Sequence, residues 1–304
     1  MNTERRIAPP CARLIVVLVV LVVLGAVSAG CGAAVPTGRF DALAEASRGV
    51  ESKTAQTDAD FIKLTRRFMT FSPAPGPYRA DSFAPVVDVG GTRVDFDFGP
   101  RLEPRQAALG VLAAYTEALA AFARKDYQGE LDQATQSLGA SAQLLAGHAS
   151  SSSAVKQGAG VLATVVNGLG HEVTERMRRA TLRKAMDDAA PGVTAIVAFV
   201  KEINGLAGTA VTTMRDQVIR RANSLTVADG PARLQLNEVV EGMIGDSSAV
   251  LVQLKQGSAA ADAIVPAHAE IRDALDRDDR AILEKLQTLV AEVKRLQRIN
   301  ASLK

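Results

Sequence analysis

Side chains that could catalyse a reaction or bind a metal are few and scattered along this chain. It contains three histidines, His148, His171 and His268, and none lies within metal-ligand spacing of another. Glu172 follows His171, but the second histidine that a zinc protease requires is missing. His148 stands beside a serine run, where we expect exposure. His268 falls on an apolar helical pattern, which favours a hydrogen-bonded core histidine over the alternative, a pH-responsive interface.

Hydroxyls, carboxylates and glycines form no stronger pattern. Ser150–Ser153 offers nucleophilic hydroxyls but lacks a Gly-x-Ser-x-Gly elbow, so we interpret it as a linker. Asp95, Asp97 and Gly99 match only part of a calcium loop and are expected on the wet face of a hairpin. Paired glycines lie inside a helical pattern, which favours close helix packing over phosphate binding. These are Gly158, Gly160, Gly168 and Gly170.

Two groups of basic residues are dense enough to consider as a binding surface. The first is Arg176, Arg178, Arg179, Arg183 and Lys184, and the second is Arg215, Arg220 and Arg221. We expect solvated helix faces offset by neighbouring acidic residues. The functional alternative is contact with phospholipid headgroups.

The N-terminus has the layout of a secretory signal peptide. Arg5, Arg6 and Arg13 form a positive region, and Leu14–Leu24 is an unbroken aliphatic run of eleven residues. Small residues follow up to Ala29, so the apolar stretch totals sixteen residues. A membrane-spanning helix needs roughly 18 or more, which favours a cleaved signal over residues 1–30.

The segment Ser28-Ala29-Gly30-Cys31 resembles the lipobox of bacterial lipoproteins. The resemblance implies cleavage before Cys31, a diacylglycerol on its thiol and an acylated new N-terminus, with chains such as palmitate. Two or three acyl chains hold a protein stably at a membrane. The chain departs from the family at Ser28, where leucine is preferred. Gly32 in place of aspartate implies the outer membrane, facing the periplasm, if the cell has two membranes. Ordinary signal cleavage and an uncleaved anchor are the alternatives.

Composition limits the other classes. The chain is 47% hydrophobic, 22% charged and 4% aromatic, with a net charge of +2. Without residues 1–30 it keeps 32 basic and 32 acidic residues, so we expect no nucleic-acid partner. Cys11 is lost with the signal and Cys31 is acylated, so no thiol pair remains for a disulfide or a metal, and we predict no cofactor.

The remaining sequence predicts a mainly α fold, an elongated antiparallel helical bundle with one small β-hairpin. The first half is residues 31–39 as a lipidated tether, then 40–149 with helices over 40–71, 103–125 and 129–147 and a hairpin near 86–99. The second half, residues 150–304, is a long-helix bundle with helices over 154–188, 192–225, 231–275 and 278–303. Pro191-Gly192 is interpreted as the turn between two of these, with apolar residues 192–200 at its tip.

Apolar residues in the second half recur at alternating steps of three and four, as in helices packed nearly parallel in a coiled coil. This pattern includes Val155, Leu162, Ile196, Val200, Ile203, Met214, Val250, Leu254, Leu286 and Leu289. If the chain folds back at Pro191, residue 178 lies beside about residue 204. The two basic groups are then several turns apart.

These observations predict a lipid-anchored cell-envelope protein of binding or scaffolding type, without catalytic activity. Its partners would be the membrane, through Cys31, and a protein that the sequence does not identify. One alternative is an enzyme or small-ligand binder with a site between residues 72–104 and the bundle, using Tyr78, Asp88, Asp95 and Tyr115. Another is a membrane-active helical protein.

Overall fold

A computed structural model describes residues 35–71, 86–89, 92–95, 98–124, 127–148, 151–169, 175–225, 230–275 and 284–302. Its elements are α2 (Thr37–Phe71), β1 (Val86–Val89), β2 (Thr92–Asp95), α3 (Gly99–Ala123), α4 (Gln128–Gly147), α5 (Ser153–Asn167), α6 (Glu175–Ser224), α7 (Gly230–Asp262), α8 (Ile264–Ala274) and α9 (Glu284–Ser302). The mainly helical class predicted from the sequence is confirmed.

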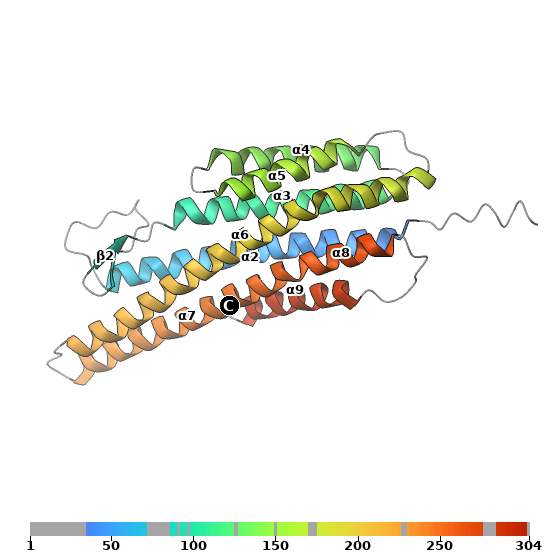
Figure 1. The fold of residues 1–304 in the computed structure, drawn as a ribbon. Coiled ribbons are helices and arrows are strands. Elements are labelled where there is room, and N and C mark those ends of the chain that lie inside the picture. Colours follow the sequence, from blue (N-terminus) through green and yellow to red (C-terminus); the bar gives the residue numbers. More distant parts are fainter. Residues whose placement is uncertain are drawn as a thin grey trace, which may run out of the picture.

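The helices run along one long axis, so the molecule is elongated (Figure 1). Helices α2 and α3 pack side by side at the centre, α4 and α5 pack against α3, and α7 and α9 pack against α2. Helix α6 contacts α3, α5, α7 and α8 and so joins the two sides. One continuous apolar core therefore includes helices from residues 40–149 and from 150–304.

The spacing of apolar residues identified the buried face of several helices. Phe61, Leu64 and Phe68 are each 2% exposed in α2, and Phe61 packs edge-on against Phe98 with ring centroids 5.1 Å apart. The predicted three-four pattern is also buried wherever the structure describes its α5, α6 and α9 members. In α7 the buried members begin at Met243, because the first part of that helix extends beyond α2.

The turn predicted at Pro191-Gly192 is wrong, because α6 continues through both residues to Ser224. Gly192 is instead a close contact with α5, where a Cβ would lie 2.7 Å from the backbone oxygen of Gly158. A Cβ on Gly158 would in turn lie 3.2 Å from the oxygen of Gly192. Close helix packing, predicted for the paired glycines, is confirmed at Gly158.

The predicted helix over 154–188 is also wrong, because α5 ends at Asn167. Gly168 is its C-cap, and the Gly168 N–H donates to the carbonyls of Thr164 and Val165 at 3.1 Å each. Residue 178 therefore does not lie beside residue 204. Both belong to α6 and are about 39 Å apart along its axis, at 1.5 Å per residue.

A buried polar network joins four helices across the core. The Arg105 guanidinium of α3 is fully buried, forms an ion pair with Asp58 of α2 and donates to the side-chain oxygen of Asn204 of α6. Asn204 Nδ2 then donates to Ser258 Oγ of α7 at 3.0 Å. Burial lowers the pKa of Arg105 to about 10, so the side chain stays charged near neutral pH. Such a network fixes the axial register of the helices it connects.

Strands β1 and β2 pair antiparallel, with Val86 opposite Asp95 and Val89 opposite Thr92. Residues 90–91 and 96–97 and the side chains of both strands lie outside the described residues, so the apolar face of the hairpin stays a prediction. The predicted end at residue 99 is wrong, because Phe98 is the N-cap of α3 and Gly99 its first residue. Helix α2 begins at Thr37, inside the range 31–39 predicted as a tether.

Candidate functional site

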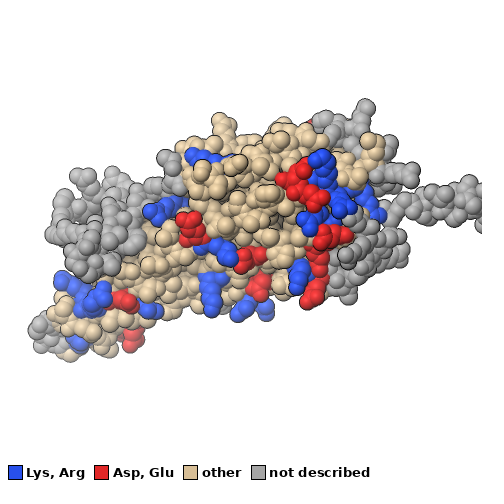
Figure 2. Space-filling model, in the orientation of Figure 1, with Lys and Arg blue, Asp and Glu red and all other residues tan. Residues whose placement is uncertain are grey.

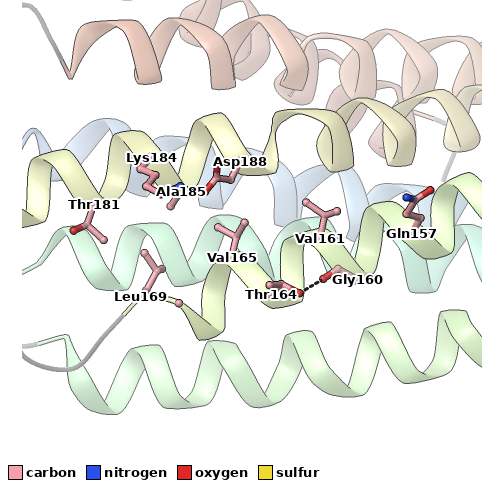
Figure 3. Close-up of a pocket in the computed structure, with 11 residues that line it drawn as sticks. Gln157, Gly160, Val161, Thr164, Val165, Leu169, Thr181, Lys184, Ala185 and Asp188 are labelled. Atoms are coloured by element: carbon pink, nitrogen blue, oxygen red, sulfur yellow. Dashed lines mark hydrogen bonds and ion pairs between the residues drawn. The ribbon is translucent and has the colours of Figure 1, made fainter.

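A groove of about 720 Å³ lies between α5 and α6 (Figure 3). It is bordered by Gln157, Gly160, Val161, Thr164 and Val165 of α5, by Gly168 and Leu169 directly after that helix, and by Thr181, Lys184, Ala185 and Asp188 of α6. Its volume falls in the range of roughly 300–1,000 Å³ typical of small-molecule sites. We refer to it as the α5–α6 groove.

The glycine contact between the two helices explains where the groove lies. Gly158 and Gly192 hold α5 and α6 together at one point, and the groove extends from there toward Leu169 at the end of α5. Gly160 lies about one helical turn after Gln157, which is at one end of the groove. No atom lies within 4 Å of the position that a Cβ would take at Gly160. Its missing side chain therefore leaves part of the groove open.

The side chains of the groove suit binding better than catalysis. Val161, Val165 and Leu169 supply an apolar wall. Thr164 Oγ1 is already a donor to the Gly160 carbonyl at 2.8 Å. Lys184 Nζ lies 2.7 Å from Asp188 Oδ2, so the charged rim is internally neutralised. No nucleophile paired with a base borders the groove.

The predicted hydrogen-bonded core histidine is confirmed at His268. Its Nε2 lies 2.9 Å from Tyr115 Oη, between α8 and α3, and the residue is 2% exposed. Burial, with the charge of Arg272, lowers the pKa of His268 to about 4. Burial also raises the pKa of Tyr115 well above its usual value. The pair is therefore neutral near pH 7 and is enclosed by the core.

The other predicted histidine and serine sites are structural where they are described. His148 is partly exposed, with Nδ1 3.9 Å from Glu103 Oε2, whereas His171 lies outside the described residues. Ser152 Oγ accepts a hydrogen bond from the Val155 N–H at 3.3 Å. It is thus the N-cap of α5, and Ser153 begins the helix, so the serine run is a helix start as well as a connection.

Several other candidates lie outside the part of the chain that the structure describes. These are Cys31, Tyr78 and Asp97, together with the side chains of Asp88 and Asp95. Tyr115, the remaining member of the alternative site between 72–104 and the bundle, is fully buried against His268.

The first basic group is the expected solvated face only in part. Arg183 meets the expectation, because its side chain is exposed and its Nε lies 3.7 Å from Asp187 Oδ2, whereas Arg178 and Arg179 do not. Arg178 is only 6% exposed, and its guanidinium lies 5.2 Å from the ring centroid of Tyr127. Arg179 donates to the Leu275 carbonyl at the end of α8. No sequence pattern indicated these contacts, because the partners are about 50 and 100 residues away along the chain. Lys184 does match the expectation through its pair with Asp188.

Charges of both signs are interspersed over the visible face of the molecule (Figure 2). Arg215, Arg220 and Arg221 lie near the end of α6, far from the first basic group. A second, polar hollow of about 480 Å³ lies between α2, α3 and α4. Its arginines are paired, Arg48 with Glu117 at 3.1 Å and Arg124 with Asp41 at 2.6 Å.

Within the described residues, no group of three or more His, Cys, Asp and Glu side chains could hold a metal. Two described helices are long and apolar enough to cross a membrane by length and composition, at Arg101–Ala123 and Met177–Ser224. Their apolar windows are 78% and 50% buried inside the fold, which is weak evidence for a span. The chain matches no protein-family model, no curated protein and no solved structure.

Proposed function

We propose that this protein is a lipid-anchored protein of the bacterial cell envelope that acts by binding rather than by catalysis. The observation that carries the proposal is Ser28-Ala29-Gly30-Cys31 directly after an aliphatic signal-like run. The diacylated Cys31 would hold the chain at a membrane, in the outer membrane facing the periplasm if the cell has two membranes.

The start of the helical body supports a membrane-proximal position. Helix α2 begins at Thr37, six residues after Cys31, and a fully extended chain of that length spans at most about 21 Å. The end of the molecule where α2 begins would therefore face the membrane (Figure 1). Helix α6 has 50 residues, a length of about 75 Å, and leads to the opposite end of the molecule. An elongated anchored body of this kind suits a scaffold or a binding protein.

The α5–α6 groove supports binding, since its wall is apolar and its rim charges are paired with each other. The alternative of an enzyme site between residues 72–104 and the bundle gains no support from Tyr115, because that side chain is sealed in the core. We therefore propose the groove as the binding surface.

The anchor is tested by expressing the full chain in a bacterium supplied with an alkyne-bearing palmitate and analysing the mature N-terminus by mass spectrometry. We expect a first residue of Cys31 carrying acyl chains, and loss of the label in Cys31→Ala. Cys11→Ala is the matched control, because Cys11 lies in the predicted signal and should not affect labelling. A mature N-terminal peptide beginning at residue 32 or later would refute the anchor.

A further inference from the structure

We propose that the α5–α6 groove binds an acyl chain of a membrane phospholipid. This inference rests on the proposed lipid anchor and names the ligand of the binding surface. Four features of the molecule support it: the apolar wall, an exposed methionine beside the groove, the distance to the anchor and the charge of the rim.

The wall presents hydrocarbon over a length suited to a chain. Val161 and Val165 lie four residues apart on one face of α5, and Leu169 follows just after its C-cap, Gly168 (Figure 3). From Gly160 to Leu169 the α5 side extends about 14 Å at 1.5 Å per residue. Ala185 lies opposite on α6, where its small side chain leaves room. The groove therefore presents apolar side chains from both helices along their length.

A large exposed apolar side chain lies near the beginning of α6. Met177 is 59% exposed and lies four residues before Thr181, on the same face of α6 as the groove residues Thr181, Lys184 and Asp188. It therefore continues the border of the groove toward the beginning of α6. A flexible thioether suits contact with irregular hydrocarbon.

The position of the anchor explains why a membrane lipid is the ligand. Helices α2 and α6 begin at the same end of the molecule (Figure 1), and Thr181 is six residues into α6. Val35, the first described residue, is four residues from Cys31, so it lies at most about 14 Å from the acylated cysteine. The end of the groove at Leu169 and Thr181 is thus held close to the bilayer that supplies the chain.

The polar atoms at the rim favour a chain without charge inside the groove. Lys184 is paired with Asp188, and Thr164 Oγ1 donates to the Gly160 carbonyl, so neither requires a ligand partner. A buried charge on the ligand would find no unpaired counter-ion among these residues. The phospholipid headgroup would accordingly remain at the mouth, in water.

The test reconstitutes the full lipidated chain in vesicles of phosphatidylethanolamine and phosphatidylglycerol that contain a phosphatidylethanolamine with a diazirine in one acyl chain. After illumination, peptides are mapped by mass spectrometry. We expect phospholipid adducts on residues 157–169 and 181–188. Gly160→Leu should lower these adducts roughly tenfold, the effect of excluding about two methylene groups from the groove.

Gly205→Leu is the matched control, because Gly205 is an exposed α6 residue with no atom within 4 Å of its Cβ position and lies outside the groove. It should leave the adducts unchanged. Adducts confined to other peptides, or equal adduct yields in both variants, would overturn the proposal and leave the groove to a partner helix or a second copy. A reconstituted chain that carries lipid on Cys31 yet shows no groove adduct refutes this inference alone. A chain without lipid on Cys31 refutes the proposed function, and with it the inference.

Discussion

Acidification should destabilise the fold through one buried histidine. His268 is enclosed between α8 and α3, with Tyr115 Oη 2.9 Å from its Nε2 and Arg272 one turn further along α8. An imidazolium there would lose its hydration and lie near another cation, which is why the pKa falls to about 4. In the unfolded chain the same imidazole has its ordinary pKa of about 6.5.

The magnitude and the pH window follow from those two values. Above pH 6.5 the imidazole is neutral in the folded and the unfolded state, so its titration does not change the free energy of unfolding. Below pH 6.5 the unfolded state binds a proton that the folded state does not, so stability falls as the pH falls and stops falling near pH 4. At 1.36 kcal/mol per pH unit, the whole window amounts to about 3 kcal/mol. That is a large part of the stability of an ordinary domain, which is about 5–15 kcal/mol.

Urea unfolding followed by circular dichroism at pH 7.5 and pH 4.5 measures this loss. Carboxylates also titrate in that interval, so the informative quantity is the difference between the wild type and His268→Gln. We expect the wild type to lose about 2–3 kcal/mol more than the variant between the two pH values. Tyr115→Phe is a control: it should cost about 1 kcal/mol at pH 7.5 and keep most of the pH dependence, because burial is the larger cause. Equal pH dependence in the wild type and His268→Gln would refute the reasoning.

Two further substitutions test the contacts that fix the helices. Gly192→Ala places a Cβ 2.7 Å from the Gly158 oxygen and should cost about 1–3 kcal/mol in urea unfolding, whereas Gly205→Ala, in open space on the same helix, should be neutral or add up to about 1 kcal/mol. An equal effect of both would contradict the close contact. Arg105→Met leaves the Asp58 carboxylate without its buried partner and should cost about 3–5 kcal/mol, part of which the double variant with Asp58→Leu should restore. If the free-energy changes of the two single substitutions simply add in the double variant, the ion pair between Arg105 and Asp58 is contradicted.

Apolar spacing made much of this fold predictable from the sequence. A buried helix face repeats every three or four residues, and that repeat is enough to pick out Phe61, Leu64 and Phe68 as the buried face of α2. It also placed His268 on a buried face, which is why a core histidine could be expected. These successes share one cause: the signal lies within the helix itself and depends little on what packs against it.

The failures share the opposite cause, since each depends on a partner far away in the sequence. Pro191-Gly192 is a strong local turn signal, but Gly192 is there because the backbone of Gly158 approaches it. The sequence around Arg178 is typical of a surface cation, but in the structure its guanidinium lies over the ring of Tyr127, which belongs to another segment. The local sequence allows a residue several structural roles, and the tertiary packing determines which of them it takes.

The misplaced turn also explains why the groove could not be predicted. A single helix over residues 154–188 would place Val161 and Ala185 about 36 Å apart along its axis. Because the helix ends after Asn167 and α6 returns along α5 from its start at Glu175, the two residues instead border the α5–α6 groove from different helices. Gly158 and Gly192 allow the two helices to approach closely beside that groove. The α5–α6 groove is thus a consequence of α5 ending at Gly168 and of α6 continuing through Gly192, two roles that the same residue type takes in different contexts.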